Sequence, residues 1–223
     1  RSFRNAMLTL ARFSLVETES YILNNATGLF VDRFAILLPG TEVNLKARLD
    51  IIEELACDSR YTGLIKRSLL RGLRSGHFNR SGGSEKQGTK TLKDYVPSLA
   101  EVKDYYSACL NMLLDNANST ADEEDIAKAL VENARGYYMS GLEGFLFDGL
   151  ELMAPKKDFV WEEMKEALAY IIQYDTKKRG DIHADEIRLW QSKLTKDDYV
   201  YKLLHLETEI LRHYNLSHEE SMK

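Results

Sequence analysis

A chain of 223 residues of which 44% are hydrophobic is long enough to bury a core, so its composition excludes a disordered protein. Only 3 prolines interrupt it, and Leu, Ala, Glu and Lys are common, which favours long helices over many short strands. The net charge of −5 is mild, with both signs mixed along the chain, which argues against a dedicated nucleic-acid surface. We therefore expect an all-α fold.

Apolar residues recur every three or four positions along most of the N-terminal part of the chain, as they do on one face of a helix. This spacing predicts helices over 3–23 and 61–73. Between them we expect a shorter helix that ends at Leu38, before Pro39, and another that starts at Thr41.

The C-terminal part opens with a helix whose start is well defined. Ser98 and Glu101 have the spacing of a capping box directly after Pro97, so a helix should begin there. Thr120 can cap the next helix, and the glycines that follow predict a bend or break at 140–141.

Further helical segments complete the prediction. One begins at Asp158, and two others cover 184–194 and 196–214, with a turn over 174–181. We therefore expect roughly eight or nine helices in antiparallel pairs, arranged as a helical bundle or a short HEAT-like α-solenoid.

Residues 75–91 form the sharpest break in composition. Gly, Ser, Lys and Arg dominate this segment, and Phe78 is its only large apolar residue. A loop of this length in a compact domain is typically either functional or disordered. We treat residues 1–223 as a single all-helical region in which this loop is the candidate sub-boundary.

Both ends of the sequence suggest a larger protein. The chain opens at Arg1 rather than at an initiator Met, and Ser217 and Glu220 have the spacing of another capping box close to the last residue. We expect that the region is cut from a longer chain. Beyond its last residue, a further helix and a disordered segment are the two alternatives.

The compartment is inferred from the cysteines and from the lack of export signals. Cys57 and Cys109 lie far apart in stretches that resemble helix interiors, so we expect two buried thiols in a reducing compartment. Asn-x-Ser/Thr triplets begin at Asn25, Asn79, Asn118 and Asn215. They are compatible with a glycosylated exterior protein, but we prefer the reading that Ser and Thr at helix starts create such triplets by themselves. The sequence has no secretory signal and no membrane-length apolar run, so we expect a cytoplasmic protein with no membrane partner.

Arg71 and His77 are the candidate catalytic pair. Their separation by six positions resembles the Arg-x(4–6)-His signature of HEPN-type ribonucleases, although Gly72 stands where that family usually has a polar residue. The resemblance implies metal-independent RNA cleavage at a dimer interface, in which His77 moves a proton and Arg71 stabilises phosphate charge. A basic helix end beside a solvated loop is the reading that we prefer.

The same stretch supplies the candidate binding residues. They are Arg71, Arg74, Phe78 and Arg80. The arginines make the stretch locally basic, and the Phe78 ring could stack on a base. A nucleic-acid partner nevertheless remains the less favoured alternative to a protein partner.

Residues 175–186 resemble an EF-hand loop, with Asp first, Gly sixth and Glu twelfth. Lys177 and Arg179 occupy the third and fifth positions, where calcium needs oxygen ligands, so we expect no calcium there. We prefer an ordinary turn with Gly180 in a left-handed conformation, and a degenerate EF-hand is the alternative. The histidines do not have the spacing of a zinc site, and the sequence has no phosphate loop or nucleophile elbow. We expect no metal, no cofactor and no enzymatic activity in this region.

Several tyrosines occur in adjacent or alternate pairs, namely Tyr105 with Tyr106, Tyr137 with Tyr138, and Tyr199 with Tyr201. The two members of such a pair cannot both face the same core. We therefore expect some of these rings at a surface or an interface, where a ring with a polar tip is useful.

Two stretches resemble the helical C-terminal arrays of large bacterial STAND-type NTPases. One runs from Trp161-Glu-Glu-Met164 through Ala167-Leu168, Tyr174-Asp175 and Arg188-Leu189 to Leu194-Thr-Lys-Asp-Asp198, and the other joins 78–85 to Asp94-Tyr-Val-Pro97 and Glu101. The resemblance implies a sensor or scaffold region in an antiviral defence protein that recognises phage components. We expect a non-catalytic recognition array that binds a protein partner or other domains of the parent chain.

Overall fold

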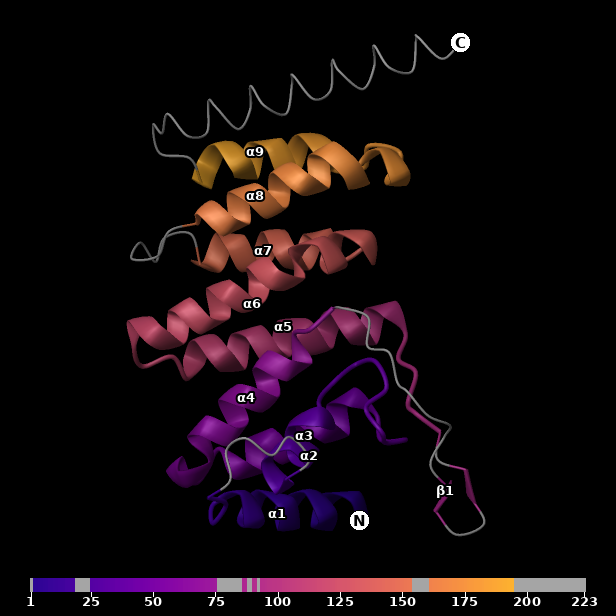
Figure 1. The fold of residues 1–223 in the computed structure, drawn as a ribbon, viewed down its shortest axis with the longest axis vertical. Coiled ribbons are helices and arrows are strands. Elements are labelled where there is room, and N and C mark those ends of the chain that lie inside the picture. The colour runs from indigo at the N-terminus through magenta and orange to yellow at the C-terminus, as the bar shows by residue number, and fades with distance from the viewer. Residues whose placement is uncertain are drawn as a thin grey trace. The chain divides into compact units, whose positions relative to one another are not determined.

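The computed structural model describes residues 2–18, 25–75, 86–87, 90–91, 93–153 and 161–194, which are mostly helical (Figure 1). The helices are α1 (Ser2–Ser14), α2 (Ala26–Asp32), α3 (Leu45–Leu55), α4 (Thr62–Gly72), α5 (Leu99–Asp115), α6 (Thr120–Met139), α7 (Glu143–Met153), α8 (Glu162–Tyr170) and α9 (Ala184–Leu194). Shorter segments are the 3-10 helices η1 (Ser59–Tyr61) and η3 (Lys177–Arg179) and the π-helix η2 (Ile171–Asp175). The only strands in the described ranges are β1 (Lys86–Gln87) and β2 (Lys90–Thr91), which form a short antiparallel pair. Because the rest of the regular structure in these ranges is helical, the predicted all-α class is confirmed.

Residue contacts divide the chain into two compact units, 1–129 and 130–223, which we call the first and the second unit. The division falls inside α6. Segment 75–91, the candidate sub-boundary, belongs to the first unit.

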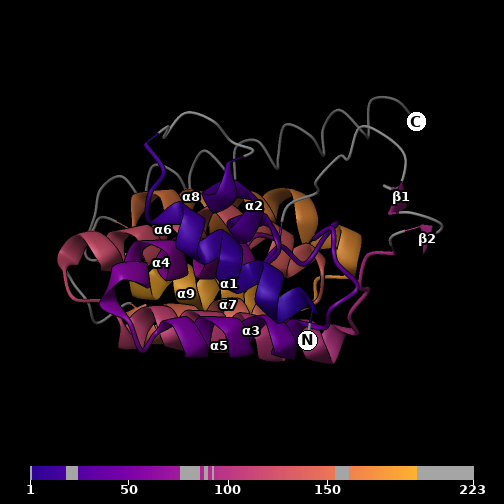
Figure 2. The same ribbon diagram turned by 90° about the horizontal axis from the view of Figure 1, so that it is seen from below.

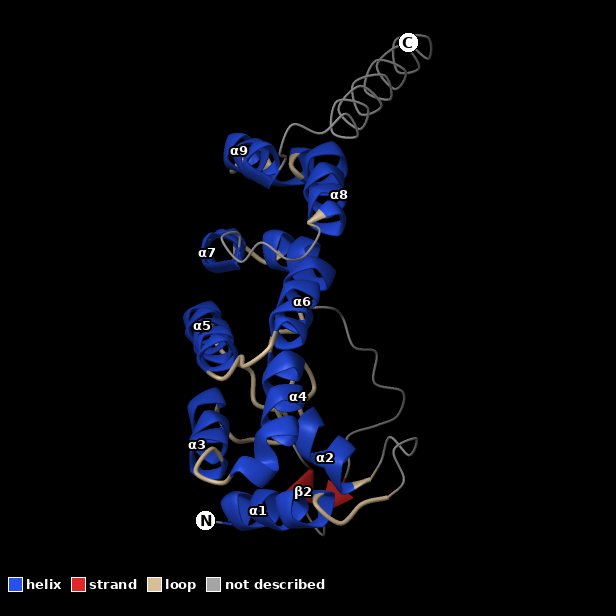
Figure 3. Cartoon of the chain, turned by 90° about the vertical axis from the view of Figure 1, so that its left-hand side faces the viewer, coloured by secondary structure: helices blue, strands red, loops and turns tan. Residues whose placement is uncertain are grey.

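The first unit has two layers of helices. α1 packs on α2, α2 on α4 and α4 on α5, while α3 packs against α5. Figure 3 shows α3 and α5 in one layer and α2 and α4 in the other. In Figure 2, which is seen from below, the ribbons of α3 and α5 overlap, consistent with their packing against each other. The helices bury one apolar face each, and the largest side chains of this core are Met7, Phe30, Phe34, Ile52, Leu69, Leu73, Tyr105 and Leu110.

The first helix is shorter than the sequence predicts. α1 ends at Ser14, and residues 15–18 leave the helix, so the expected continuation is wrong there; residues 19–24 lie outside the described ranges. Glu17 instead reaches the start of α2, where its carboxylate accepts hydrogen bonds from the amide and the hydroxyl of Thr27 at 3.2 and 2.6 Å. Capping α2 therefore competes with prolonging α1.

Asparagine side chains start the next two helices. Asn25 and Asn44 each accept a hydrogen bond from the backbone amide three residues further on, at 2.8 Å. The predicted start of the third helix at Thr41 is wrong, because Thr41 is buried and its hydroxyl accepts from the amide of Val43 at 3.2 Å. α3 consequently begins at Leu45.

A buried arginine holds the loop between α2 and α3. Arg48 is 0% exposed, and its guanidinium donates to three backbone carbonyls of residues 33–43, at 2.8 to 3.2 Å. Burial lowers the pKa of this guanidinium, and the carbonyl oxygens offset part of that cost. The second helix, which was expected to reach Leu38, is shorter: α2 ends at Asp32, and Leu38 lies in the loop with a left-handed backbone (φ 49°).

Tyrosines of the adjacent pairs in α5 and α6 are buried, so the prediction that some lie at a surface is wrong for Tyr105, Tyr106, Tyr137 and Tyr138. α5 packs on both α3 and α4, so two adjacent residues of α5 each find a covered environment. The Tyr105 hydroxyl donates to the carbonyl of Phe34 at 2.8 Å, and the Tyr106 hydroxyl donates to that of Arg74 at 3.1 Å. The third pair, Tyr199 and Tyr201, lies outside the described residues.

The start of α6 is held by its own sequence and by α4. Ser119, one residue before the predicted cap at Thr120, accepts a hydrogen bond from the amide of Asp122 at 3.2 Å. Lys66 of α4 forms ion pairs of 2.6 Å with both Asp122 and Asp125. Hydrogen bonds, first of all the one from Lys66, lower the pKa of Asp122 to about 2.

Both cysteines are free thiols. Cys109 is buried in α5 as predicted, but Cys57 is exposed, so the prediction of two buried thiols is wrong for Cys57. The reason is that α3 ends at Leu55, which places Cys57 in the turn that follows rather than in a helix interior.

In the second unit, the break predicted at 140–141 is confirmed. α6 ends at Met139, and Gly141 adopts a left-handed conformation (φ 76°) that favours glycine. α7 follows, and its Phe145 ring meets the Tyr137 ring edge-on at 5.0 Å. The hydroxyl of Tyr138 donates to the carbonyl of Ile182 at 2.8 Å.

The last described helices of the second unit pack together. α8 continues into η2, and both pack on α9, whose bounds Ala184–Leu194 agree with the prediction. The expected start at Asp158 and the expected helix over 196–214 lie outside the described residues. Among the helices that are described, none is long and apolar enough to span a membrane.

Candidate interaction site

The structure gives the predicted Arg71–His77 pair only one described member. Arg71, in the last turn of α4, places Nη2 3.2 Å from Oδ1 of Asp32 on α2, and its side chain is only 17% exposed. His77 lies outside the described residues. Arg71 thus links two helices, and the ribonuclease pair stays a prediction.

The other predicted binding residues are equally dispersed. Arg74 is exposed just after α4, and its carbonyl accepts a hydrogen bond from the Tyr106 hydroxyl at 3.1 Å. Phe78 and Arg80 lie outside the described residues. The described part of the chain therefore brings none of these residues together into a site.

The segment that resembles an EF-hand loop is held by ion pairs instead. Asp175, at the first loop position, is 0% exposed and lies 2.6 Å from Nε of Arg135 and 3.1 Å from Nζ of Lys178. Arg179 pairs with Glu143 at 2.9 Å, and Gly180 is left-handed (φ 67°) as expected. Within the described residues, no group of His, Cys, Asp and Glu side chains has the arrangement of a metal site.

One of these ion pairs, between Arg135 and Asp175, also holds an exposed aromatic surface in the second unit. The Arg135 guanidinium lies over the Tyr170 ring, with Cζ 4.8 Å from the centroid. The Tyr170 ring in turn lies 4.6 Å from the Tyr174 ring, at an interplanar angle of 44°. We call Arg135, Tyr170 and Tyr174 the arginine–tyrosine ladder.

Local backbone structure places the two rings on one face. Tyr170 ends α8 and Tyr174 belongs to η2, where the amide of Thr176 reaches back five residues to the carbonyl of Ile171 at 3.0 Å. Side chains four positions apart remain neighbours on such a helix. Ile171 itself is buried, so the tyrosines lie toward the solvent side, with 44% and 43% of their surfaces exposed.

The ion pair with Asp175 holds the Arg135 guanidinium in its place in the ladder. Burial by itself would raise the pKa of Asp175, but the hydrogen bonds from Arg135 and Lys178 outweigh it and lower that pKa. The hydrogen bond with Asp175 raises the pKa of Arg135. A buried carboxylate therefore anchors the guanidinium over the Tyr170 ring, while the arginine side chain stays 51% exposed.

This arrangement is suited to binding rather than to covalent chemistry. Two rings and a guanidinium held in place lose little conformational entropy when a partner covers them. Tyr and Arg are enriched among the residues that dominate binding energies at protein interfaces. Lys178, which pairs with the same Asp175 carboxylate, adds a further donor.

The exposed rings are not the tyrosines that the sequence singled out. The prediction rested on adjacent pairs, whereas Tyr170 and Tyr174 are four positions apart and flank the apolar pair Ile171-Ile172. That spacing was the signal available in the sequence. The contribution of Arg135, on a different helix, carries no local signal.

Comparison with known proteins assigns no family. No protein-family model matches the chain, and neither the curated proteins nor the solved structures give a match. Inferences about function therefore rest on the side chains of the described residues.

Proposed function

We propose that the chain is a non-catalytic helical scaffold or recognition region that binds a protein partner through the arginine–tyrosine ladder. The parent that fits the sequence resemblance is a large, defence-related protein of the STAND type. The observation that carries the proposal is the exposed pair of adjacent, mutually tilted tyrosine rings, of which Tyr170 lies under the Arg135 guanidinium that the buried Asp175 anchors.

Charge favours a protein over a nucleic acid as the partner. Arg135 and Lys178 share the single carboxylate of Asp175, so this group of side chains keeps only one net positive charge. A phosphate backbone needs several unpaired cations, and the net charge of −5 would repel it. A flat apolar or aromatic side chain with a nearby carboxylate complements the ladder better.

The test compares matched variants as baits. Wild type, Tyr170→Ala, Tyr174→Ala and Phe13→Ala are incubated with nuclease-treated lysate of the source organism, and bound proteins are quantified by mass spectrometry. Phe13 is the control because it is an aromatic ring of the first unit with 57% exposure. We expect one protein whose recovery falls about 30-fold with either tyrosine variant and is unchanged with Phe13→Ala, as removal of a hot spot would produce.

Two results would oppose this proposal. Equal recovery of every protein by all four baits would remove the ladder as the binding surface. The second result is that the purified chain cleaves RNA and that His77→Ala abolishes this cleavage without changing the circular dichroism spectrum. It would replace the scaffold proposal with the HEPN-like ribonuclease that uses Arg71 and His77.

A further inference from the structure

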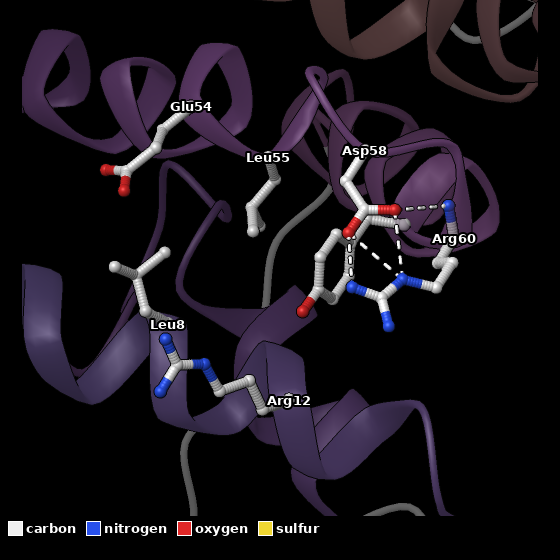
Figure 4. Close-up of a pocket in the computed structure, with 7 residues that line it drawn as sticks. Leu8, Arg12, Glu54, Leu55, Asp58 and Arg60 are labelled. Atoms are coloured by element: carbon white, nitrogen blue, oxygen red, sulfur yellow. Dashed lines mark hydrogen bonds and ion pairs between the residues drawn. The ribbon is translucent and has the colours of Figure 1, made fainter.

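A pocket of about 270 Å³ opens in the first unit, away from the residues of the ladder in sequence. Leu8 and Arg12 of α1 line one side. The other side is lined by Glu54 and Leu55 at the end of α3 and by Asp58, Arg60 and Tyr61 around η1 (Figure 4). The volume is that of a side chain or a small molecule rather than of a large cofactor.

Most charges at this pocket are already paired. Glu54 accepts hydrogen bonds from Arg4, one of them from Nε at 2.7 Å. Asp58 is occupied by Arg60, whose Nε lies 3.0 Å from both carboxylate oxygens and whose Nη2 lies 2.6 Å from Oδ2 (Figure 4). These two acids and two arginines cancel in charge.

Two donors at the pocket remain unused. The Arg12 guanidinium makes no ion pair or side-chain hydrogen bond with any residue that the structure describes. Tyr61 is only 7% exposed, and within the same described ranges its hydroxyl has no hydrogen-bond partner. Although the ring is buried, the hydroxyl oxygen itself is in contact with solvent, so it can donate to a ligand.

We propose that this pocket binds a carboxylate carried on a small apolar group. Arg12 supplies the one positive charge at the pocket that no described residue compensates, and a planar fork that matches a carboxylate. Tyr61 supplies a further donor, and Leu8 and Leu55 supply apolar walls for the body of the ligand. A single cation of this kind suits a monoanion better than a phosphate dianion.

The same chemistry occurs in two kinds of ligand. A free branched-chain acid presents one carboxylate beside an apolar group, and so does the C-terminal residue of a peptide that ends in leucine. Both satisfy the proposed recognition, and the experiment separates them.

The first arm is a titration of the full chain with N-acetyl-leucine, followed by isothermal calorimetry and by amide chemical shifts. We expect saturable binding in the millimolar range and shifts centred on the residues of the pocket. N-acetyl-leucinamide, which differs only in lacking the charge, should bind about tenfold more weakly or worse. Equal affinity for the amide, or saturation by inorganic phosphate but not by N-acetyl-leucine, would overturn the proposal.

The second arm uses variants of the protein. Arg12→Met should abolish saturable binding, and Tyr61→Phe, which keeps the ring, should weaken it by about tenfold. Arg67→Met is the matched control, because Arg67 is exposed on α4 and donates to its own helix at 3.2 Å. Undiminished binding by a folded Arg12→Met variant would remove the site.

A third arm identifies the source of the carboxylate. A hexapeptide that ends in leucine is compared with N-acetyl-leucine. If the peptide binds more tightly, and if amidation of its C-terminus abolishes that binding, the pocket is assigned to a peptide end. Equal affinity for the peptide and for N-acetyl-leucine would assign it to a small acid.

Discussion

Gly72, in the last turn of α4, marks a close approach between two helices in the first unit. A Cβ atom there would lie 3.0 Å from Sγ of Cys109 and 3.1 Å from the hydroxyl oxygen of Tyr105 on α5. Neither group can move away easily, because Cys109 is fully buried and Tyr105 is held by its hydrogen bond to Phe34.

We predict that Gly72→Ala destabilises the protein by about 1–3 kcal/mol, as overpacking of a core does, although alanine is the better helix former. Urea denaturation followed by circular dichroism measures this change. Gly63→Ala in the same helix is the control, because a Cβ atom added there would meet no neighbouring atom within 4 Å. That variant should be neutral or gain up to about 1 kcal/mol, and a loss equal to that of Gly72→Ala would contradict the packing argument.

At the scale of a single element, the start of α5 rests on a reciprocal cap. Ser98 Oγ accepts from the amide of Glu101 at 3.3 Å, and the Glu101 carboxylate accepts from the amide of Ser98 at 2.9 Å. Ser98→Ala should cost about 1 kcal/mol of unfolding free energy, measured by the same urea titration. Lys103→Ala, an exposed change in the next turn, should stay within about 0.5 kcal/mol; a similar loss there would argue against the cap.

Elements with local signals could be predicted from the sequence. The capping box of Ser98 and the bounds 184–194 of α9 were predicted correctly, because both depend on residues only a few positions apart. The start of α3 was missed because Thr41 and Asn44 are both good caps, and only burial of Thr41 decides between them. The end of α2 depends on Arg48, whose donors reach back into the preceding loop.

The candidate site could be predicted only in part. The four-residue spacing of Tyr170 and Tyr174 is visible in the sequence, but it does not tell which side of the helix is covered. Arg135 lies 40 residues before Asp175, and a pairing at that separation follows from packing rather than from local pattern. The pocket at Arg12 was not foreseen for the same reason.

For the molecule as a whole, two buried carboxylates contribute to the response to acid. Asp175 and Glu143 both have lowered pKa values: burial opposes the shift, and their hydrogen bonds with arginines outweigh it. An acid whose pKa is lower in the folded than in the unfolded state adds stability above its unfolded pKa. That contribution is lost as the pH falls through the folded pKa, which for Asp175 means from about pH 4 downward.

We predict that Asp175→Asn lowers the thermal midpoint at pH 7, with a free-energy cost of about 1–2 kcal/mol, because the neutral amide pairs less well with Arg135. The difference from wild type should shrink as the pH falls below about 4, since protonated aspartate resembles asparagine. Differential scanning calorimetry between about pH 3 and pH 7 provides the measurement. Asp185→Asn, a change at a side chain that is 99% exposed, should shift the midpoint little at any pH. A pH-independent difference for Asp175→Asn would contradict the assignment.

Because the two cysteine thiols differ in exposure, their rates of alkylation can be used to follow unfolding of the protein. Cys57 is open to solvent, whereas burial raises the pKa of the Cys109 thiol to about 12, so almost no thiolate forms there at neutral pH. An alkylating reagent should therefore modify the first thiol at once and the second only when α5 separates from α4. The chain can thus carry one dye without mutagenesis, and slow entry of a second label would time the opening of the first unit.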